Sequence, residues 1–120
     1  MKYVLDTNIV IYLQKGVLQE SLPIADFGIS IITEMELRSY SALTSQQRHW
    51  LVLFINDVQV FGLSNAIKEK TIELRQQYRL KLPDAIVCAT AIVEQAILLT
   101  NDKGLHQVNG LHCQLLAVAL

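Results

Sequence analysis

Short strand-like apolar runs alternate along this chain with longer segments in which apolar residues recur every three or four positions. The β-branched and aromatic runs predict five strands, and the segments of helical periodicity predict the helices between them. The predicted strands cover residues 2–5, 28–32, 58–61, 97–100 and 111–116. The predicted helices cover 8–14, a segment from about 33, 45–56, a segment after 64 and a segment from about 83, while 20–23 is a break or a short helix.

Details within these segments predict which helix faces are buried. In helix 45–56 we expect Trp50, Leu53 and Phe54 to point inward. Ser64 is typical of an N-cap, and the helix after it has one buried face that carries Ile67, Thr71, Leu74 and Tyr78. The helix that begins near Pro83 is apolar nearly all round, which predicts a position inside the protein.

Strands that alternate with helices predict right-handed crossovers and a parallel sheet covered on both faces. A length of 120 residues fits one domain, and neither repeats nor linkers interrupt it. We therefore expect a single α/β domain over residues 1–120.

Composition narrows the class of protein. The chain is 52% hydrophobic and 18% charged, which excludes an intrinsically disordered chain. Its longest nearly apolar stretch, 85–93, is too short for a membrane helix, and Asp6 precedes any signal-peptide core. Cys88 and Cys113 do not have metal-finger spacing and are expected to be buried. These features predict a soluble, cytoplasmic protein.

The charge balance bears on nucleic-acid binding. A net charge of −1 excludes a strongly basic nucleic-acid footprint, although it leaves a nucleic-acid enzyme open because active-site acids cancel basic residues elsewhere. Five of the ten Lys and Arg residues lie in 68–81, which we interpret as a solvated helix face.

Four acidic residues fall where the predicted strands end or the predicted helices begin. Asp6 ends the first strand, Asp102 directly follows the fourth, and Glu36 and Asp84 each lie in the first turn of a helix. Ligands of open parallel sheets bind in the crevice at the carboxyl ends of the strands, where the helices also begin. The four carboxylates are therefore expected to converge on one crevice.

Each acidic residue also has a local structural explanation. Thr33-x-x-Glu36 is a capping-box pattern, and Asp84 in a first helical turn complements the helix dipole. Asx turns would account for Asp6 and Asp102 where the chain leaves strands. Taken singly, each acid fits these explanations better than a functional one.

Taken together, the acids favour a metal site. Asp84 is the only charged residue in 82–93, and Asp6 is the only one in 3–14. Close, buried carboxylates repel one another and take up protons unless a cation neutralises them. A pocket of oxygen ligands suits Mg²⁺ or Mn²⁺, and one or two such ions activate water for phosphodiester hydrolysis.

Four segments of the chain resemble those of PIN-domain ribonucleases, and most closely the VapC-type toxins of VapBC toxin–antitoxin pairs. They are YVLDTNI at 3–9, SIIT at 30–33 with EL at 36–37, LPDAI at 82–86 with ATA at 89–91, and LTND at 99–102. Their order and spacing fit from end to end. The chain differs from the family pattern at 38–40, where glycine is common, and at Leu105, where an aromatic is common.

The resemblance implies a five-stranded, mostly parallel sheet and a Mg²⁺- or Mn²⁺-dependent endoribonuclease. It implies a ligand and catalytic set of Asp6, Glu36, Asp84 and Asp102, with Thr7 or Asn101 as supporting polar groups. It also implies a homodimer, an RNA substrate and a cognate antitoxin that blocks the site.

Several other side chains have two interpretations. Arg38 forms a surface ion pair with Glu34 or contacts a phosphate or the antitoxin. His106 faces solvent or shares an ion with Asp102. Trp50 and Tyr78 fit a helix core or a dimer contact better than a base-stacking platform.

Two other functions compete with the nuclease. A phosphoryl-receiver module has a similar length and an acidic pocket, and Lys103 resembles its lysine. It needs its acceptor aspartate at the carboxyl end of the central strand, whereas Asp57 precedes the strand 58–61. A PIN scaffold that binds a partner without catalysis is the third interpretation, and the four intact acids argue against it.

Overall fold

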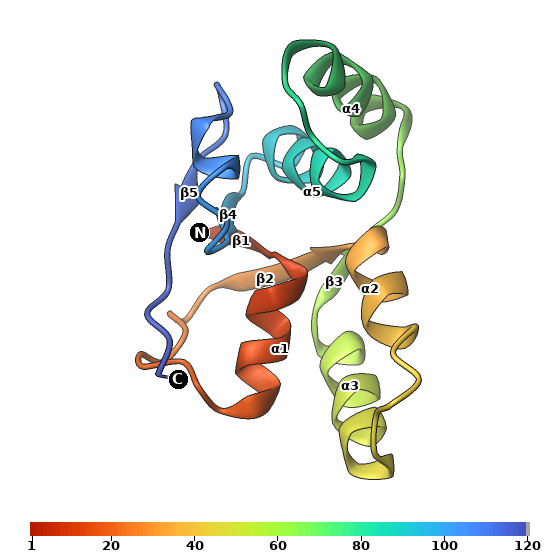
Figure 1. Cartoon of the computed structure of the whole chain (residues 1–120), viewed down its shortest axis with the longest axis vertical. Coiled ribbons are helices and arrows are strands. Elements are labelled where there is room, and N and C mark those ends of the chain that lie inside the picture. Colours follow the sequence, from red (N-terminus) through yellow and green to blue (C-terminus); the bar gives the residue numbers. More distant parts are fainter. Residues whose placement is uncertain (120) are drawn as a thin grey trace.

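The computed structural model describes residues 1–119 and contains a five-stranded sheet between two layers of helices (Figure 1). The strands are β1 (Lys2–Leu5), β2 (Asp26–Ser30), β3 (Gln59–Phe61), β4 (Ile97–Leu99) and β5 (Cys113–Gln114). Every neighbouring pair in the order β3-β2-β1-β4-β5 is parallel. The predicted α/β fold is confirmed. The last residue of the predicted domain, 120, lies outside the described residues.

The helices connect these strands in the alternating order that the sequence predicts. They are α1 (Thr7–Lys15), α2 (Ile31–Arg38), α3 (Ser45–Asp57), α4 (Asn65–Gln77) and α5 (Leu82–Val93), with a short 3-10 helix, η1 (Leu105–Gln107). Ser64 caps α4 by accepting a hydrogen bond from the Ile67 N–H, as predicted. Pro83 lies in the first turn of α5, where its missing N–H leaves no partner unsatisfied.

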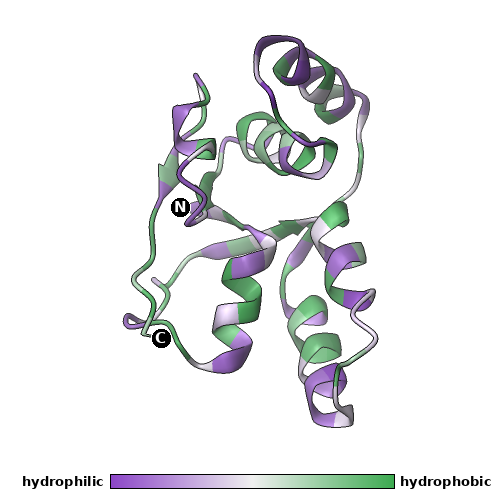
Figure 2. Ribbon diagram, in the orientation of Figure 1, coloured by the Kyte–Doolittle hydropathy of each residue, from purple (hydrophilic) through white to green (hydrophobic). Residues whose placement is uncertain are grey.

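Alternate residues of β1 face two separate hydrophobic cores. Val4 packs on the side of α4 and α5, with Ile67 and Val87. Leu5 packs on the opposite side, with Ile9 of α1 and Leu51 of α3. The hydrophobic colouring of α5 in Figure 2 agrees with the predicted interior position, since six of its twelve residues are buried.

The junction between β2 and α2 differs from the prediction. The apolar, β-branched residues Ile31 and Ile32 are typical of a strand, yet the helix already begins at Ile31. Ser30 is the N-cap, and its side chain accepts a hydrogen bond from the Ile32 N–H. The predicted capping box from Thr33 to Glu36 is therefore wrong.

Other predictions concern exposed and buried side chains. Leu53 was expected to point inward but is 51% exposed, while Leu51 is the buried residue of α3. Trp50 is half-buried and stacks on Phe54, with ring centroids 5.2 Å apart.

No helix formed within residues 1–119 is long and apolar enough to span a membrane.

The cysteines follow the expected pattern in part. Cys88 is fully buried and Cys113 is half-buried, and both are free thiols. Burial is the first cause that raises the pKa of Cys88 to about 12 and that of Cys113 to about 11. At neutral pH both side chains are therefore neutral thiols that pack as hydrophobic groups.

The strand order reverses between β1 and β4, at the centre of the sheet. The chain forms β1, β2 and β3 outward in one direction, then returns to place β4 on the other side of β1. Such a switch point opens a crevice at the carboxyl ends of the strands, where ligands of α/β sheets bind. Asp6 follows β1 directly, and Asp102 lies three residues after the end of β4.

Candidate active site

Asp6 is the first of the predicted acids at this crevice, and both of its carboxylate oxygens have hydrogen-bond donors. It is the N-cap of α1, and its Oδ1 accepts a hydrogen bond from the Thr7 N–H at 2.8 Å. Its Oδ2 accepts a hydrogen bond of 2.7 Å from the Thr100 hydroxyl. These two hydrogen bonds fix the orientation of the Asp6 carboxylate.

Thr100 connects Asp6 with Asp102. Its side chain is fully buried at the end of β4, and its hydroxyl oxygen also accepts a hydrogen bond from the Asp102 N–H at 3.1 Å. The carboxylate of Asp102 is exposed and accepts a hydrogen bond from the Gly104 N–H at 3.0 Å. One buried hydroxyl therefore positions the backbone that carries Asp102 and the carboxylate of Asp6.

Glu36 reaches the site from the second turn of α2, not from a first turn as predicted, because the helix begins at Ile31. Its Oε1 accepts a hydrogen bond of 2.7 Å from the Thr7 hydroxyl. The Thr7 hydroxyl also lies 3.1 Å from that of Thr33, which is fully buried. Thr7 thus holds Glu36 against the start of α1.

Asp84 lies half-buried in the first turn of α5, as predicted. Burial, followed by repulsion from the carboxylates of Asp6, Asp102 and Glu36, raises the pKa of Asp84 above its ordinary value, and Lys81 opposes this shift. Asp6 after β1, Asp102 after β4 and Glu36 on α2 are thus close enough for their charges to act on Asp84.

Within residues 1–119, however, no three His, Cys, Asp or Glu side chains are gathered around a point where they could hold a metal ion. Hydrogen bonds hold the carboxylates of Asp6 and Glu36 to threonines, and like charges repel. The donor set nevertheless fits Mg²⁺ or Mn²⁺ in kind, since all four groups are carboxylates. The pKa of Asp84 is raised first by burial and then by a repulsion from the other acids that a cation would relieve.

The two predicted supporting residues have different surroundings. Thr7 contacts both Asp6 and Glu36. Asn101 instead exchanges two hydrogen bonds of 2.8 Å with the backbone N–H and carbonyl of Leu116. The Asn101 side chain thus joins the end of β4 to the C-terminal segment.

His106 makes a backbone contact that the sequence does not predict. It lies in η1, is half-buried, and its Nε2 is 3.0 Å from the carbonyl oxygen of Thr100. Because a carbonyl only accepts, Nε2 must carry the proton. His106 therefore supports the backbone at Thr100.

Sequence reasoning missed three residues of the site, namely Thr33, Thr100 and His106. A search for acids and metal ligands passes over a threonine, although Thr100 directly follows an apolar strand. A polar residue at that point is a detectable signal, because a buried hydroxyl requires a partner.

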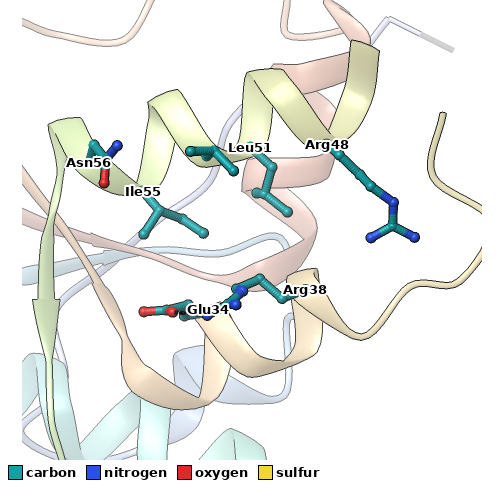
Figure 3. Close-up of a pocket in the computed structure, with 7 residues that line it drawn as sticks. Glu34, Arg38, Arg48, Leu51, Ile55 and Asn56 are labelled. Carbon is teal, nitrogen blue, oxygen red and sulfur yellow. Dashed lines mark hydrogen bonds and ion pairs between the residues drawn. The ribbon is translucent and has the colours of Figure 1, made fainter. Parts of the chain in front are cut away.

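A hollow of about 470 Å³ lies apart from these acids, between α2 and α3 (Figure 3). Glu34 and Arg38 line it from α2, and Leu51 and Ile55 line it from α3. Arg38 Nη1 lies 3.0 Å from Glu34 Oε2, so the predicted surface ion pair is present.

The structure also bears on the receiver-module interpretation. Asp57 is the last residue of α3 and precedes β3, which is an edge strand. It therefore lies at the amino end of an edge strand, whereas a receiver requires its acceptor at the carboxyl end of the central strand. The phosphoryl-receiver interpretation is wrong.

Comparison with known proteins agrees with this fold. The PIN domain family matches residues 3–111. Among solved structures, a toxin–antitoxin complex from Klebsiella pneumoniae has a chain 32% identical to this one, with a TM-score of 0.73 over 91% of this chain and 94% of that one. VapBC-1 from nontypeable Haemophilus influenzae is 25% identical, with a TM-score of 0.76 over 95% and 97%.

Another solved structure has a similar fold at a lower sequence identity. DNA-bound VapBC from Salmonella typhimurium is 19% identical, with a TM-score of 0.80 over 96% of this chain and 98% of that one. No curated protein matches the chain in sequence. The match over residues 3–111 and the five-stranded parallel sheet establish that this chain belongs to the PIN domain family.

Proposed function

We propose that this chain is a metal-dependent endoribonuclease that acts as the toxin of a toxin–antitoxin pair. The observation that carries the proposal is that Asp6 and Asp102 follow the two strands that border the switch point, where their charges and that of Glu36 add to burial in raising the pKa of Asp84. The toxin role is supported by the similarity to chains of toxin–antitoxin complexes. The substrate is RNA, and the reaction is hydrolysis of a phosphodiester bond.

Asp6, Glu36 and Asp84 would hold a Mg²⁺ or Mn²⁺ ion, and Asp102 would hold a second ion or act through water. When bound, such an ion activates water and stabilises negative charge at the phosphate. Water attacks phosphorus directly, so the protein does not form a covalent intermediate. The catalytic and ligand set is thus the four carboxylates named from the sequence.

The surrounding residues prepare these carboxylates. The Thr100 and Thr7 hydroxyls donate to Asp6 and Glu36, which orients both carboxylates. The burial of Asp84 and the repulsion from the other acids favour proton uptake by Asp84. Cation binding therefore requires loss of any proton that Asp84 holds, which links occupancy of the site to pH.

The remaining parts of the proposal concern partners and location. The toxin would be a cytoplasmic homodimer and would bind a cognate antitoxin that blocks the site. Val52 and Leu53 on α3 are exposed apolar side chains, and they support a protein-binding surface on that helix. A PIN scaffold that has lost catalysis is the alternative function, and it would keep partner binding alone.

The test is cleavage of end-labelled single-stranded RNA with Mg²⁺ or Mn²⁺, repeated with EDTA. Asp84→Asn is the key variant, and Asp26→Asn is its control because Asp26 is an exposed acid at the start of β2. We expect metal-dependent cleavage that falls by at least ~100-fold in Asp84→Asn alone, the upper end of losses seen on disturbing even supporting groups of a metal site. Full activity in a folded Asp84→Asn protein would contradict the assignment. Absence of cleavage across structured and unstructured RNAs would favour the scaffold.

A further inference from the structure

A groove beside the carboxylates combines them with two basic residues. It has a volume of about 350 Å³ and is lined by Asp84, Asp102, Arg79 and Lys81. The two basic residues belong to the segment between α4 and α5, two helices that Figure 1 shows on the same side of the sheet. We infer that this groove binds the RNA backbone, with Arg79 and Lys81 contacting a phosphate next to the one that is cleaved. The inference rests on the proposed function and assigns its substrate-positioning residues.

The two cations are available for a ligand. Both are exposed, and across residues 1–119 neither takes part in an ion pair or a side-chain hydrogen bond. Other basic residues differ in this respect, since Arg38 pairs with Glu34 and Lys70 pairs with Glu73 at 3.1 Å. The unpaired cations of this loop thus lie at the edge of the acidic site.

The loop that carries these cations is fixed on both sides. Arg75 Nε donates to the carbonyl of Leu80 at 3.3 Å, and Leu80 packs against the core. On the other side, the Asn109 N–H donates to the Tyr78 hydroxyl at 2.9 Å. A fixed backbone reduces the ordering that must accompany ligand binding, which favours a preformed site.

Charge identifies the ligand. Four carboxylates repel a polyanion, and the net charge of −1 supplies no general attraction for RNA. Binding therefore needs local cations close to the acids. Lys81 is such a cation, since its charge acts to lower the pKa of Asp84. Arginine matches phosphate geometry through two parallel N–H donors, and lysine binds phosphate as a point charge.

The same loop borders a second hollow, which is also lined by basic residues. This hollow has a volume of about 490 Å³, shares Tyr78, Arg79 and Leu80 with the groove, and is also lined by Arg75. Arg79 therefore lies between the two hollows. A single strand that leaves the carboxylates through the groove would continue over the end of α4.

The experiment measures RNA binding without cleavage. A short fluorescein-labelled single-stranded RNA is titrated with protein in EDTA, and its anisotropy is followed between about 50 and 200 mM salt. The test variant is Arg79→Gln with Lys81→Gln. The control is Lys68→Gln with Lys70→Gln, which removes the same charge from α4 outside the groove. Circular dichroism and thermal melting check that both variants fold as the wild type does.

We expect the test variant to bind RNA about tenfold more weakly at low salt and to lower the salt slope by about 0.7 for each phosphate that is no longer neutralised. The control variant is expected to change the affinity by less than about twofold, since charges away from the strand contribute little. In cleavage kinetics, the test variant should raise KM and change kcat little. Equal weakening in both variants, unchanged affinity in the test variant, or absence of RNA binding by the wild type would overturn the inference.

These readouts separate the inference from the proposed function. Groove-dependent binding by a wild-type protein that does not cleave RNA would support the groove and refute the nuclease. Metal-dependent cleavage with no difference between the two double variants would support the nuclease and refute the groove.

Discussion

The hydroxyl of Thr100 donates a hydrogen bond of 2.7 Å to the carboxylate of Asp6, across 94 residues of sequence. This contact joins the ends of β4 and β1, the two strands that border the switch point of the sheet. It makes a buried, uncharged residue part of the acidic site and gives a direct way to perturb that site without removing a carboxylate.

Thr100→Val is therefore expected to reduce RNA cleavage by about 10–100-fold, as loss of a ligand-orienting partner does in metal sites. It should also lower the free energy of unfolding by about 1–3 kcal/mol, because the Asp102 N–H loses its acceptor. Steady-state cleavage and chemical denaturation measure the two effects.

Thr71→Val is the matched control for this variant. Thr71 is also buried, but its hydroxyl donates at 2.7 Å to the carbonyl of Ile67 within α4, away from the acids. Its activity should stay within about twofold of the wild type, and equal losses of activity in both variants would refute the role given to Thr100.

The raised pKa of Asp84 predicts how the metal-free protein responds to pH. The pKa of Asp84 is higher in the folded state than its ordinary value of 3.8. Proton binding by Asp84 therefore favours the folded state, an effect that is fully present below pH 3.8 and is lost as pH rises through the folded pKa. Asp84→Asn removes this loss, so in EDTA it should melt at a higher temperature than the wild type at pH 7. The difference should shrink toward pH 4. A melting temperature that falls at pH 7 would contradict the destabilising effect of burial and repulsion on the charged Asp84 carboxylate.

The two thiols predict a second pH dependence. With a pKa of about 12 for Cys88 and about 11 for Cys113, both are almost entirely protonated at pH 8. Alkylation by iodoacetamide should be slow in the native protein and rise about tenfold per pH unit up to pH 10, because the thiolate is the nucleophile. Fast labelling at pH 8, followed by mass spectrometry, would contradict the burial of these thiols.

Gly28 in the inner strand β2 and Gly62 just after the edge strand β3 form a matched pair for a test of stability. A Cβ at Gly28 would overlap the Phe61 ring and lie 3.1 Å from the Gln59 carbonyl oxygen, whereas a Cβ at Gly62 would meet nothing within 4 Å. Gly28→Ala should lower the free energy of unfolding by about 1–3 kcal/mol through overpacking. Gly62→Ala should change it by less than about 0.5 kcal/mol, as surface substitutions do. Equal effects in urea denaturation would contradict the packing of β2 against β3.

The sequence predicted those features that depend on local chemistry. Ser64 and Pro83 mark the starts of α4 and α5 by capping and by a missing N–H, and both predictions are confirmed. The alternation of strands and helices correctly predicted the parallel sheet. The prediction of a strand at Ile31 and Ile32 is wrong. β-branched residues favour strands, but the N-cap at Ser30 starts a helix there.

Residues that act through long-range contacts could not be found in the same way. Nothing local distinguishes Thr100 as a partner of Asp6, or His106 as a support for Thr100. The four acids could be predicted as site residues because carboxylates are rare within apolar segments and because the topology of a parallel sheet gathers strand ends. Their exact partners required the packed chain.

The central claim is that the four carboxylates form one divalent-cation site, and Mn²⁺ binding tests it most directly. Free Mn²⁺ is followed by electron paramagnetic resonance as wild type, Asp84→Asn and Asp26→Asn proteins are added at pH 7. We predict that the wild type and Asp26→Asn bind one or two Mn²⁺ ions and that Asp84→Asn weakens the binding by about 10–100-fold. Undiminished Mn²⁺ binding by Asp84→Asn, or absence of binding by the wild type, would contradict the account.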